Sequence, residues 1–357
     1  MKIAMIGHKQ IPGRSGGVEV VVEELATRMA KEHEVTVYNR KNGEKQPKEY
    51  KGVKINETFT INKKSLDALI YSFVASLKVL FKKYDVIHYH ALGPSVMLLI
   101  PKLFKRKTKI VATVHGLDWQ RAKWGGFGTK YLKFGEKIIA KYADEVIVLS
   151  KNMQQYFLDN YNRQTIYVPN GIPENKKIKA KEIKELYGLE EGSYILFLSR
   201  IVPEKGLHYL IDAYNQMNID KKLVIAGATS NTNEYYNSIV EKAKENKNII
   251  MTGFVSGTIL NELYTNASVF ILPSEIEGMP LVLLEAMSYD IPILASNIPE
   301  NVEIIGEENT FRTQDVNNLK ERLEEVLSLP EVPNIKKDKY DWDKISNQTL
   351  EIYKKGS

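Results

Sequence analysis

The chain of 357 residues contains no cysteine. This absence excludes disulfide bonds, thiolate metal sites and cysteine nucleophiles, and it is typical of proteins from a reducing compartment. Long apolar runs are also absent, because no stretch of the sequence approaches the roughly 20 apolar residues of a membrane-spanning helix. The apolar run within residues 1–7 is too short for a signal peptide. We therefore expect a cytoplasmic protein.

The composition is otherwise that of a globular protein. Hydrophobic residues at 43% and charged residues at 26% exclude a wholly disordered or fibrous chain. The charge is uneven: residues 1–170 carry 29 Lys+Arg and 15 Asp+Glu, net +14, whereas residues 171–357 carry 21 and 29, net −8. A basic half predicts contact with nucleic acid, an anionic membrane or a phosphorylated acceptor, or it is simply a lysine-rich solvated surface.

Short apolar runs alternate with amphipathic stretches along the whole chain. The runs are rich in Val and Ile, which is typical of strands buried on both faces. They are Lys2–Ile6, Glu34–Tyr38, Asp85–Tyr89, Lys109–Val114, Glu145–Leu149, Ile166–Val168, Tyr194–Ser199, Lys222–Ala226, Ile249–Thr252, Ser268–Leu272 and Pro292–Ala295. Helical spacing is found in Val18–Lys31, Ser65–Lys83, Lys205–Met217, Glu234–Glu245, Leu281–Ser288 and Val316–Leu327. This alternation predicts an α/β protein with parallel sheets covered by helices.

The number of these strand-helix units indicates two domains. The strand-helix units are too numerous for one open sheet of ordinary size. They also exceed the eight units of a closed barrel. A turn-rich segment at residues 168–173 interrupts the pattern near the middle of the chain. We therefore expect two Rossmann-like domains that meet near residue 170, with the barrel as the less favoured alternative.

Functional residues are expected directly after the apolar runs, because ligands of open parallel sheets bind at the carboxyl ends of the strands. The first such loop, residues 7–17, ends in Gly16 and Gly17, which allow a ligand to approach the backbone at a helix N-terminus. The spacing differs from the G-x-G-x-x-G fingerprint, and Asn39 stands where an NAD-binding enzyme has an acid. A plain tight turn explains this loop equally well.

The loop after the run at 109–114 is rich in side chains that can bind ligands: His115, Asp118, Trp119, Arg121, Lys123 and Trp124. Stacking on Trp119 or Trp124 suits a sugar ring, although the two indoles can instead close the core under a long loop. In the neighbouring run, His88 and His90 are expected to point to opposite faces of their strand, one of them buried for structural reasons.

The second half carries charged residues in the same position relative to its strands. Arg200 and Lys205 lie across one turn and can converge on a diphosphate at the next helix N-terminus. Glu285 lies within an apolar helix, where a carboxylate needs hydrogen-bond donors such as ligand hydroxyls. Glu277 lies in the preceding loop, and Gly278 leaves room for backbone amides to meet a phosphate.

Residues 273–287 read P-S-x-x-E-G-x-P-x-x-x-x-E-A-M, and the E-x7-E pair resembles that of the retaining glycosyltransferases of family GT4. Further segments resemble landmarks of this family in its own order: residues 16–19, 113–116, 168–171, 200–206 and 342–344. The resemblance implies a GT-B fold, in which two Rossmann-like domains face a cleft. It implies an acceptor domain at 1–170, completed by a crossover helix at 341–357, and a nucleotide-sugar domain at 171–340.

The resemblance also implies roles for individual residues. Arg200 and Lys205 would hold the donor diphosphate, and Glu285 the ribose hydroxyls. Glu277 would bind the transferred sugar and His115 the sugar or phosphate face near the reacting carbon, and these two are the expected catalytic residues. Further donor positions are Gly16, Gly17, Gly278, Met279 and Leu281. Acceptor positions are Asp118, Trp119, Arg121 and Trp124. The loop after His115 is similar to a bacterial branch that includes rhamnosyltransferases, which makes dTDP-rhamnose a candidate donor beside UDP-sugars.

The chemistry favours a metal-free, retaining transfer. Negative charge grows on the departing diphosphate, so the protein must supply positive charge and N–H donors. A glycosidase-type pair needs carboxylates about 5 Å apart, but Glu277 is expected on a loop and Glu285 in a helix, and the resemblance implies that both bind ligands. We therefore favour front-face substitution without a covalent intermediate. The one Asp-x-Asp sequence, Asp341-Trp342-Asp343, begins an amphipathic stretch and is interpreted as a helix N-cap. We therefore expect no metal and no other cofactor.

Other functions remain as alternatives. A non-hydrolysing sugar-nucleotide epimerase shares the GT-B fold, a Rossmann oxidoreductase shares the alternating pattern, and a nucleic-acid-binding protein would explain the basic half. No nucleic-acid-binding motif is present, so we expect no such partner. Basic segments with apolar residues, at 63–66, 77–83 and 102–107, instead predict docking on the anionic inner face of the cell membrane. The expected acceptor is accordingly a lipid-linked saccharide.

Overall fold

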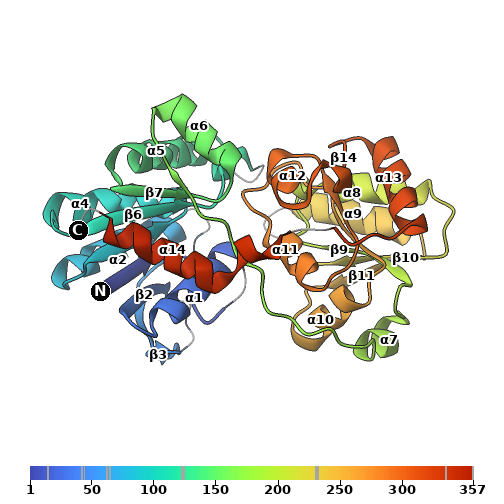
Figure 1. The fold of residues 1–357 in the computed structure, drawn as a ribbon, viewed down its shortest axis with the longest axis horizontal. Helices are drawn as coiled ribbons and strands as arrows, with labels where there is room; N and C mark the ends of the chain where they lie inside the picture. The colour runs from blue at the N-terminus through green and yellow to red at the C-terminus, as the bar shows by residue number, and fades with distance from the viewer. Residues whose placement is uncertain are drawn as a thin grey trace. The chain divides into compact units, whose positions relative to one another are not determined.

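The computed structural model describes residues 1–13, 16–41, 43, 45–61, 63, 66–121, 125–229, 233–333 and 336–355. The chain forms two compact units, Met1–Gly171 with Asp338–Ser357, and Ile172–Lys337 (Figure 1). The ranges expected from the sequence were 1–170 with 341–357, and 171–340. Each unit contains one open sheet, of eight strands in the first unit and six in the second. The competing single barrel is therefore wrong.

The sheet of the first unit has the order β3-β4-β2-β1-β5-β6-β7-β8. Its strands are β1 (Lys2–Ile6), β2 (Glu34–Arg40), β3 (Glu49–Tyr50), β4 (Val53–Thr58), β5 (Val86–His90), β6 (Lys109–Val114), β7 (Glu145–Val148) and β8 (Ile166–Tyr167). Its helices are α1 (Gly17–Met29), α2 (Asp67–Lys78), η1 (Val79–Phe81), α3 (Leu92–Ser95), η2 (Val96–Leu98), α4 (Leu99–Phe104), η3 (Asp118–Gln120), α5 (Gly126–Tyr142), α6 (Lys151–Tyr161) and α14 (Trp342–Lys354). Neighbouring strands are parallel, except that the short edge strand β3 pairs antiparallel with β4.

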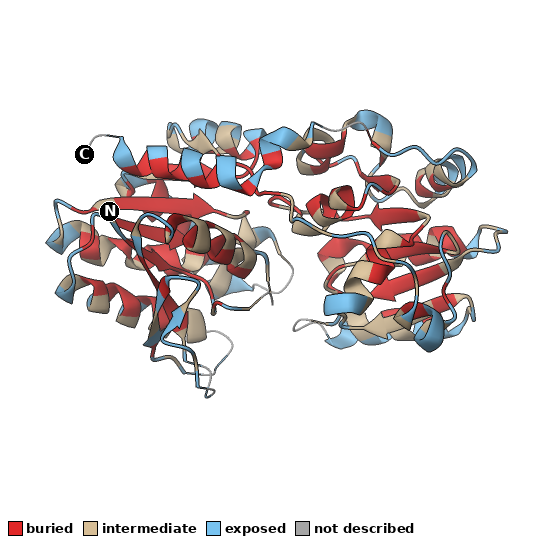
Figure 2. Cartoon of the chain, turned by 60° about the horizontal axis from the view of Figure 1, so that its bottom comes forward, coloured by how far each residue is buried: buried red, intermediate tan, exposed pale blue. Residues whose placement is uncertain are grey.

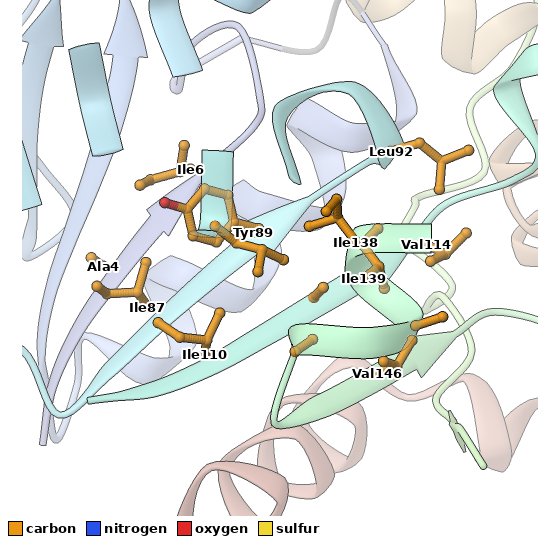
Figure 3. Close-up of a cluster of buried hydrophobic side chains, with 14 of the residues drawn as sticks. Ala4, Ile6, Ile87, Tyr89, Leu92, Ile110, Val114, Ile138, Ile139 and Val146 are labelled. Atoms are coloured by element: carbon orange, nitrogen blue, oxygen red, sulfur yellow. The ribbon is translucent and has the colours of Figure 1, made fainter. Parts of the chain in front are cut away.

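The central strands of this sheet are buried on both faces, as their apolar runs predict. One face carries Ile87 and Tyr89 of β5, which pack with Ile138 of α5 in the cluster of Figure 3. Each fully buried side chain of this size contributes about 1.5–3 kcal/mol. The expectation that His88 and His90 point to opposite faces is wrong, since strand residues two apart share a face. Their ring centroids lie 4.1 Å apart.

The last helix, α14, packs on the first unit (Figure 1). Its first residue, Trp342, is buried against Gly171, where a Cβ atom would lie 2.4 Å from the indole ring. The Asp341 side chain accepts a hydrogen bond from the Lys344 backbone N–H at 2.8 Å, so the predicted N-cap is confirmed. Asp343 forms an ion pair with Arg28 at 2.7 Å. Both carboxylates of the Asp-x-Asp sequence therefore have structural partners.

The sheet of the second unit is entirely parallel, with the order β11-β10-β9-β12-β13-β14. Its strands are β9 (Tyr194–Leu198), β10 (Lys222–Ala226), β11 (Ile249–Gly253), β12 (Val269–Leu272), β13 (Ile293–Ser296) and β14 (Thr310–Phe311). Its helices are α7 (Glu182–Tyr187), η4 (Pro203–Lys205), α8 (Leu207–Asn215), α9 (Asn233–Lys244), α10 (Gly257–Thr265), α11 (Leu281–Ser288), α12 (Pro299–Ile305), η5 (Glu307–Asn309) and α13 (Val316–Ser328). The short helix η6 (Lys337–Tyr340) begins at the last residue of this unit and leads into α14 of the first. Figure 2 shows buried strands in both units beneath helices with exposed outer faces.

Candidate functional site

Each sheet has a point where the strand order reverses. In the first unit this point lies between β1 and β5, and in the second between β9 and β12. Ligands of open α/β sheets bind outside the carboxyl ends of the strands at such a point. Each unit therefore has one candidate region, and the two are described separately.

In the second unit, the loops that follow β9 and β12 are joined to each other. Gly206 has φ +64°, and a Cβ atom there would lie 2.0 Å from the Pro273 carbonyl oxygen, so only glycine fits. The Glu275 backbone N–H donates to the Glu204 carbonyl oxygen at 2.9 Å. These contacts hold the two loops in one fixed arrangement at the switch point.

Lys205 and Glu277 form an ion pair across these two loops. Their side chains are only 9% and 8% exposed, so each charge depends on the other for compensation. The sequence expectation placed Lys205 at a diphosphate and Glu277 at a sugar, and the structure brings the two into direct contact. The Lys205 ammonium carries three N–H donors, and it uses one of them to bind the Glu277 carboxylate.

Glu285 lies in the middle of α11 and is half-buried. Its carboxylate accepts a hydrogen bond from the Tyr264 hydroxyl at 3.2 Å. Burial, together with this carboxylate, holds the pKa of Tyr264 well above its usual value, so the phenol stays protonated and donates. The sequence predicted that the Glu285 carboxylate needs hydrogen-bond donors, and the Tyr264 hydroxyl is one of them.

The remaining positions predicted in this unit lie around the same two loops. Arg200 is half-buried and lies two residues after the end of β9. Gly278 and Met279 are buried in the segment before α11, and Leu281 is the first residue of that helix. The first N–H groups of a helix have no partner within it, and they favour negative charge. Cationic side chains and a helix N-terminus therefore occur together at this edge of the sheet.

In the first unit, the glycine loop is braced by helix α1. Gly16 is the extended N-cap residue and Gly17 the first residue of the helix. The buried carboxylate of Glu19 accepts the Lys9 backbone N–H at 2.8 Å. Since a Cβ atom on Gly16 would lie 2.6 Å from a Glu19 carboxylate oxygen, the glycine leaves room for this bracing side chain.

Asn39, at the end of β2, is fully committed to the same loop. Its Oδ1 accepts hydrogen bonds from His8 Nε2 at 2.8 Å and the Ile11 backbone N–H at 3.1 Å. Its Nδ2 donates to the Ile11 carbonyl oxygen at 2.7 Å and to Gln46 Oε1 at 2.9 Å. These four bonds use the whole capacity of the amide. The position that binds ribose in dinucleotide enzymes is therefore occupied internally, which argues against the oxidoreductase alternative.

Three histidines lie next to one another where β5 and β6 end. His115 Nε2 is 3.1 Å from His90 Nδ1. His88 is bonded to the Tyr353 hydroxyl and to Thr113 Oγ1, both at 2.7 Å. Burial lowers the pKa of His115 to about 4 and of His88 to about 3, and it holds the pKa of His90 well below its usual value. All three rings are therefore neutral near pH 7.

Trp119 is tied into the structure of its loop. Its indole N–H donates to Glu136 Oε2 at 2.8 Å, and Lys133 Nζ lies 4.3 Å from the ring centroid. Asp118 and Arg121, both predicted to meet the acceptor, form an ion pair with each other at 3.2 Å. The indole thus offers less free surface than the sequence suggested.

Sequence reasoning missed the residues that organise this loop. Glu136 is fully buried on α5, a helix that the apolar spacing did not predict, and it also accepts the hydroxyls of Tyr156 and Tyr161. Lys123 and Trp124 lie outside the described residues, so the proposed role of Trp124 stays a prediction. The sequence signals a role for His90 only by its position: His90 ends β5, and His115 directly follows the neighbouring strand β6.

Two surveys cover only the residues that the structure describes. Within those ranges, no group of three or more His, Cys, Asp or Glu side chains is arranged to hold a metal ion. In the same described part of the chain, no helix combines the length and apolar character needed to cross a membrane.

Comparison with known proteins gives matches to both units. Residues 15–176 match the model of Glycosyltransferase Family 4, and residues 179–340 match that of Glycosyl transferases group 1. An uncharacterized glycosyltransferase of Methanocaldococcus jannaschii is 29% identical over 76% of this chain and 75% of its own length. The UDP-Gal:alpha-D-GlcNAc-diphosphoundecaprenol alpha-1,3-galactosyltransferase of Escherichia coli is 27% identical over 64% and 62%. Among solved structures, Anabaena Alr3699/HepE in complex with UDP and glucose superposes with a TM-score of 0.80 at 18% identity, covering 99% of each chain.

Proposed function

Because the chain belongs to the family 4 glycosyltransferases of group 1 and has the GT-B fold, we propose that it transfers a sugar from a nucleoside diphosphate sugar to a saccharide acceptor in cell-surface polysaccharide synthesis. The observation that carries this proposal is the buried Lys205–Glu277 pair at the β9/β12 switch point, with Glu285 on the adjoining helix. This arrangement combines a cation for a diphosphate with carboxylates for hydroxyl groups.

The donor binds to the second unit in this proposal. Arg200 and Lys205 hold the diphosphate, assisted by backbone amides at Gly278, Met279 and Leu281. Glu277 binds the transferred sugar and Glu285 the ribose. Preorganised positive charge of this kind stabilises the negative charge that develops on the leaving diphosphate. UDP-sugars are the first donors to test, since the Escherichia coli relative names UDP-Gal and the Anabaena protein was solved with UDP and glucose. dTDP-rhamnose is the second.

The first unit supplies the acceptor side. We place the acceptor near Asp118, Trp119 and Arg121, and we assign Gly16 and Gly17 to the donor phosphates and His115 to the reacting sugar. Transfer proceeds by front-face substitution with retention of configuration and without metal, the leaving diphosphate taking the acceptor proton. A neutral His115 suits this scheme, because it can form a hydrogen bond with a sugar oxygen without carrying a charge of its own.

A ligand panel tests this function directly. UDP, GDP, ADP and dTDP are compared with NAD and duplex DNA by thermal shift, and the stabilising nucleotide selects the donor sugars for assay. One nucleoside diphosphate is expected to stabilise the protein and NAD and DNA are not. Stabilisation by NAD or DNA alone contradicts the proposal. Conversion of the donor into an epimeric sugar nucleotide without any acceptor identifies the epimerase instead.

Mechanism is tested on the product. Proton NMR of the new glycosidic linkage is expected to show the anomeric configuration of the donor, and activity is expected to survive EDTA. An inverted anomeric signal contradicts retention. Loss of activity in EDTA with recovery in Mn²⁺ or Mg²⁺ contradicts the metal-free scheme.

We further propose that the first unit docks on an anionic membrane and takes a lipid-linked acceptor. Phe81 at the end of η1, and Leu103 and Phe104 at the end of α4, are 89%, 67% and 73% exposed. Lys105 Nζ donates to the Lys82 carbonyl oxygen at 2.5 Å, which joins the two segments. The name of the Escherichia coli relative specifies a diphosphoundecaprenol-linked acceptor.

The exposed apolar residues Phe81, Leu103 and Phe104 are followed in the sequence by four exposed cations: Lys82, Lys83, Arg106 and Lys107. Each cation near an anionic leaflet contributes about 1 kcal/mol, and the aromatic side chains add apolar burial. The combination therefore suits an anionic lipid surface better than a uniformly charged polyanion such as nucleic acid.

Sedimentation with liposomes tests the docking. Binding is expected with anionic but not neutral vesicles, and it should weaken at high salt because the Debye length shortens. The Arg106→Glu/Lys107→Glu and Phe104→Ser variants should bind less. Leu329→Ser, which changes a 77% exposed apolar residue of the second unit, is the matched control. Equal sedimentation with neutral and anionic vesicles contradicts the proposal. Equally fast transfer to a short water-soluble acceptor and to its lipid-linked form also contradicts it.

A further inference from the structure

His90 is the last residue of β5 and lies within the sheet of the first unit. It is fully buried, and its backbone pairs with Thr113 of β6. Gly7, after β1, approaches so closely that a Cβ atom there would lie 2.1 Å from the His90 carbonyl oxygen. The His90 ring lies between those of His88 and His115, with centroids 4.1 and 5.3 Å away. Its Nδ1 atom is thereby fixed beside His115.

The hydrogen bond between these two rings links their protonation. A neutral imidazole carries its proton on one nitrogen and a lone pair on the other. If His90 Nδ1–H donates to His115 Nε2, then His115 carries its own proton on Nδ1. If His115 Nε2–H donates instead, then its Nδ1 is a bare acceptor and His90 is protonated on Nε2. The tautomer of His90 therefore decides whether His115 offers a donor or an acceptor at its remaining nitrogen.

The surroundings of His90 favour the first arrangement. His90 Nε2 is buried without a hydrogen-bond partner among the described residues. A proton on that atom would leave a buried N–H unsatisfied, and such groups are rarer in proteins than under-satisfied acceptors. A proton on Nδ1 is used at once in the 3.1 Å bond to His115.

The neighbouring groups His88, Asp118 and Arg121 do not reverse this choice. His88, the ring on the far side of His90, has both nitrogens engaged by Tyr353 and Thr113. Asp118 raises and Arg121 lowers the pKa of His115, and the two side chains pair with each other. His115 itself is half-buried, so part of the ring remains accessible to a ligand.

We propose that His90 is a positioning residue that donates from Nδ1 to His115 Nε2 and thereby holds His115 in its Nδ1–H form, a hydrogen-bond donor toward an oxygen of the sugar nucleotide. The role toward the sugar nucleotide rests on the proposed function, but the tautomer does not. An N–H donor is the form that suits hydroxyl and phosphate oxygens as negative charge develops.

The tautomer is measured without substrate, on the full chain labelled with ¹⁵N-histidine. Long-range ¹H–¹⁵N spectra distinguish protonated from bare ring nitrogens, and a His115→Gln sample identifies the His115 signals. The expected result is a protonated Nδ1 and a bare Nε2 on His115. In His90→Leu the population should shift toward the Nε2–H form, whereas His90→Asn, whose amide can replace the Nδ1 donor, should preserve the wild-type signals. A wild-type His115 protonated on Nε2 overturns the proposal.

Kinetics provide the second readout. His90→Leu should lower kcat about tenfold or more, as expected for one lost hydrogen bond that acts in the transition state, with a smaller change in the KM for the donor. His90→Asn should recover most of kcat, and Tyr353→Phe, which removes only the hydroxyl bonded to His88, is the control. Failure of His90→Asn to recover activity while the tautomer is preserved overturns the catalytic part. If no donor is turned over by the wild type, the proposed function fails while the tautomer result stands, and if His90→Leu does not fold, the wild-type and His90→Asn spectra still decide the outcome.

Discussion

The two units share one architecture but differ in the chemistry of their candidate regions. In the first unit the histidines that end β5 and follow β6 are held neutral, and the charged groups of the region include the Glu19 carboxylate and the Asp118–Arg121 ion pair. In the second unit the region contains a buried ion pair and a half-buried carboxylate. The net charges of the two halves do not predict this difference, since residues 1–170 are basic and residues 171–357 are acidic. Net charge therefore describes the solvated surface of a unit, whereas the charge of a site depends on what burial and pairing allow.

The largest effect that sharpens this comparison is acid sensitivity of the first unit. Burial lowers the pKa of His8 and His115 from 6.5 to about 4 and of His88 to about 3. Below pH 6.5 these histidines bind protons in the unfolded chain but stay neutral in the folded chain. The free energy of unfolding therefore falls as the pH drops from 6.5 toward 4. Each such histidine contributes a slope of about 1.4 kcal/mol per pH unit.

Tryptophan fluorescence reports this unit selectively. All three tryptophans, Trp119, Trp124 and Trp342, belong to its residues. Urea midpoints followed by fluorescence should fall steeply between pH 6.5 and 4.5, and less steeply in His88→Gln, which removes one titrating ring. A midpoint that is constant over this range would mean that the histidines are not buried as neutral groups.

The next largest effect concerns the ion pair of the second unit. Lys205→Met leaves the Glu277 carboxylate buried without this ion-pair partner. The free energy of unfolding, measured by calorimetry, should therefore fall by about 3–5 kcal/mol. Lys242→Met, which breaks the exposed pair with Asp212, is the matched control and should cost less than about 1 kcal/mol. The double variant Lys205→Met/Glu277→Leu should recover stability but not nucleotide binding. Recovery of both would show that the charges serve the fold alone.

A smaller effect separates the two carboxylates of the E-x7-E pair. Glu285→Ala should weaken nucleoside diphosphate binding by about one to two decades, the equivalent of one charge-assisted hydrogen bond. Glu277→Ala should lower kcat more than it lowers this affinity, since its proposed partner is the sugar. Isothermal titration and steady-state kinetics measure the two quantities. Equal losses of affinity in both variants would contradict the division of roles.

The smallest effect is expected at the C-terminal helix. Asp341→Ala removes the N-cap of α14 and should lower the stability of the first unit by about 1 kcal/mol, with activity still indifferent to EDTA. Asp343→Ala, which removes only the ion pair with Arg28, should cost less because Asp343 is 70% exposed. A metal requirement that appears or disappears in either variant would reopen the interpretation of the Asp-x-Asp sequence.

The secondary structure could largely be predicted because its signals are local. The apolar runs Lys2–Ile6, Lys109–Val114 and Lys222–Ala226 coincide with β1, β6 and β10. The runs did not predict β3 and β14, which have two residues each and lie at sheet edges, or β4, which is partly exposed. Two residues are too few to show a period of two, and β4 has only two apolar residues, Val53 and Ile55. The error over His88 and His90 was of another kind, since a period of two already places both on one face.

By itself, the sequence determined the alternation of strands and helices, the cap at Asp341 and the identity of the residues that follow each strand, because these depend on neighbours only a few positions apart. The tertiary structure decided which of those residues meet. Lys205 and Glu277 are joined because β9 and β12 are adjacent in the sheet, and His90 and His115 because β5 and β6 are. Strand order is a collective result of packing all helices on both faces, and no local period encodes it.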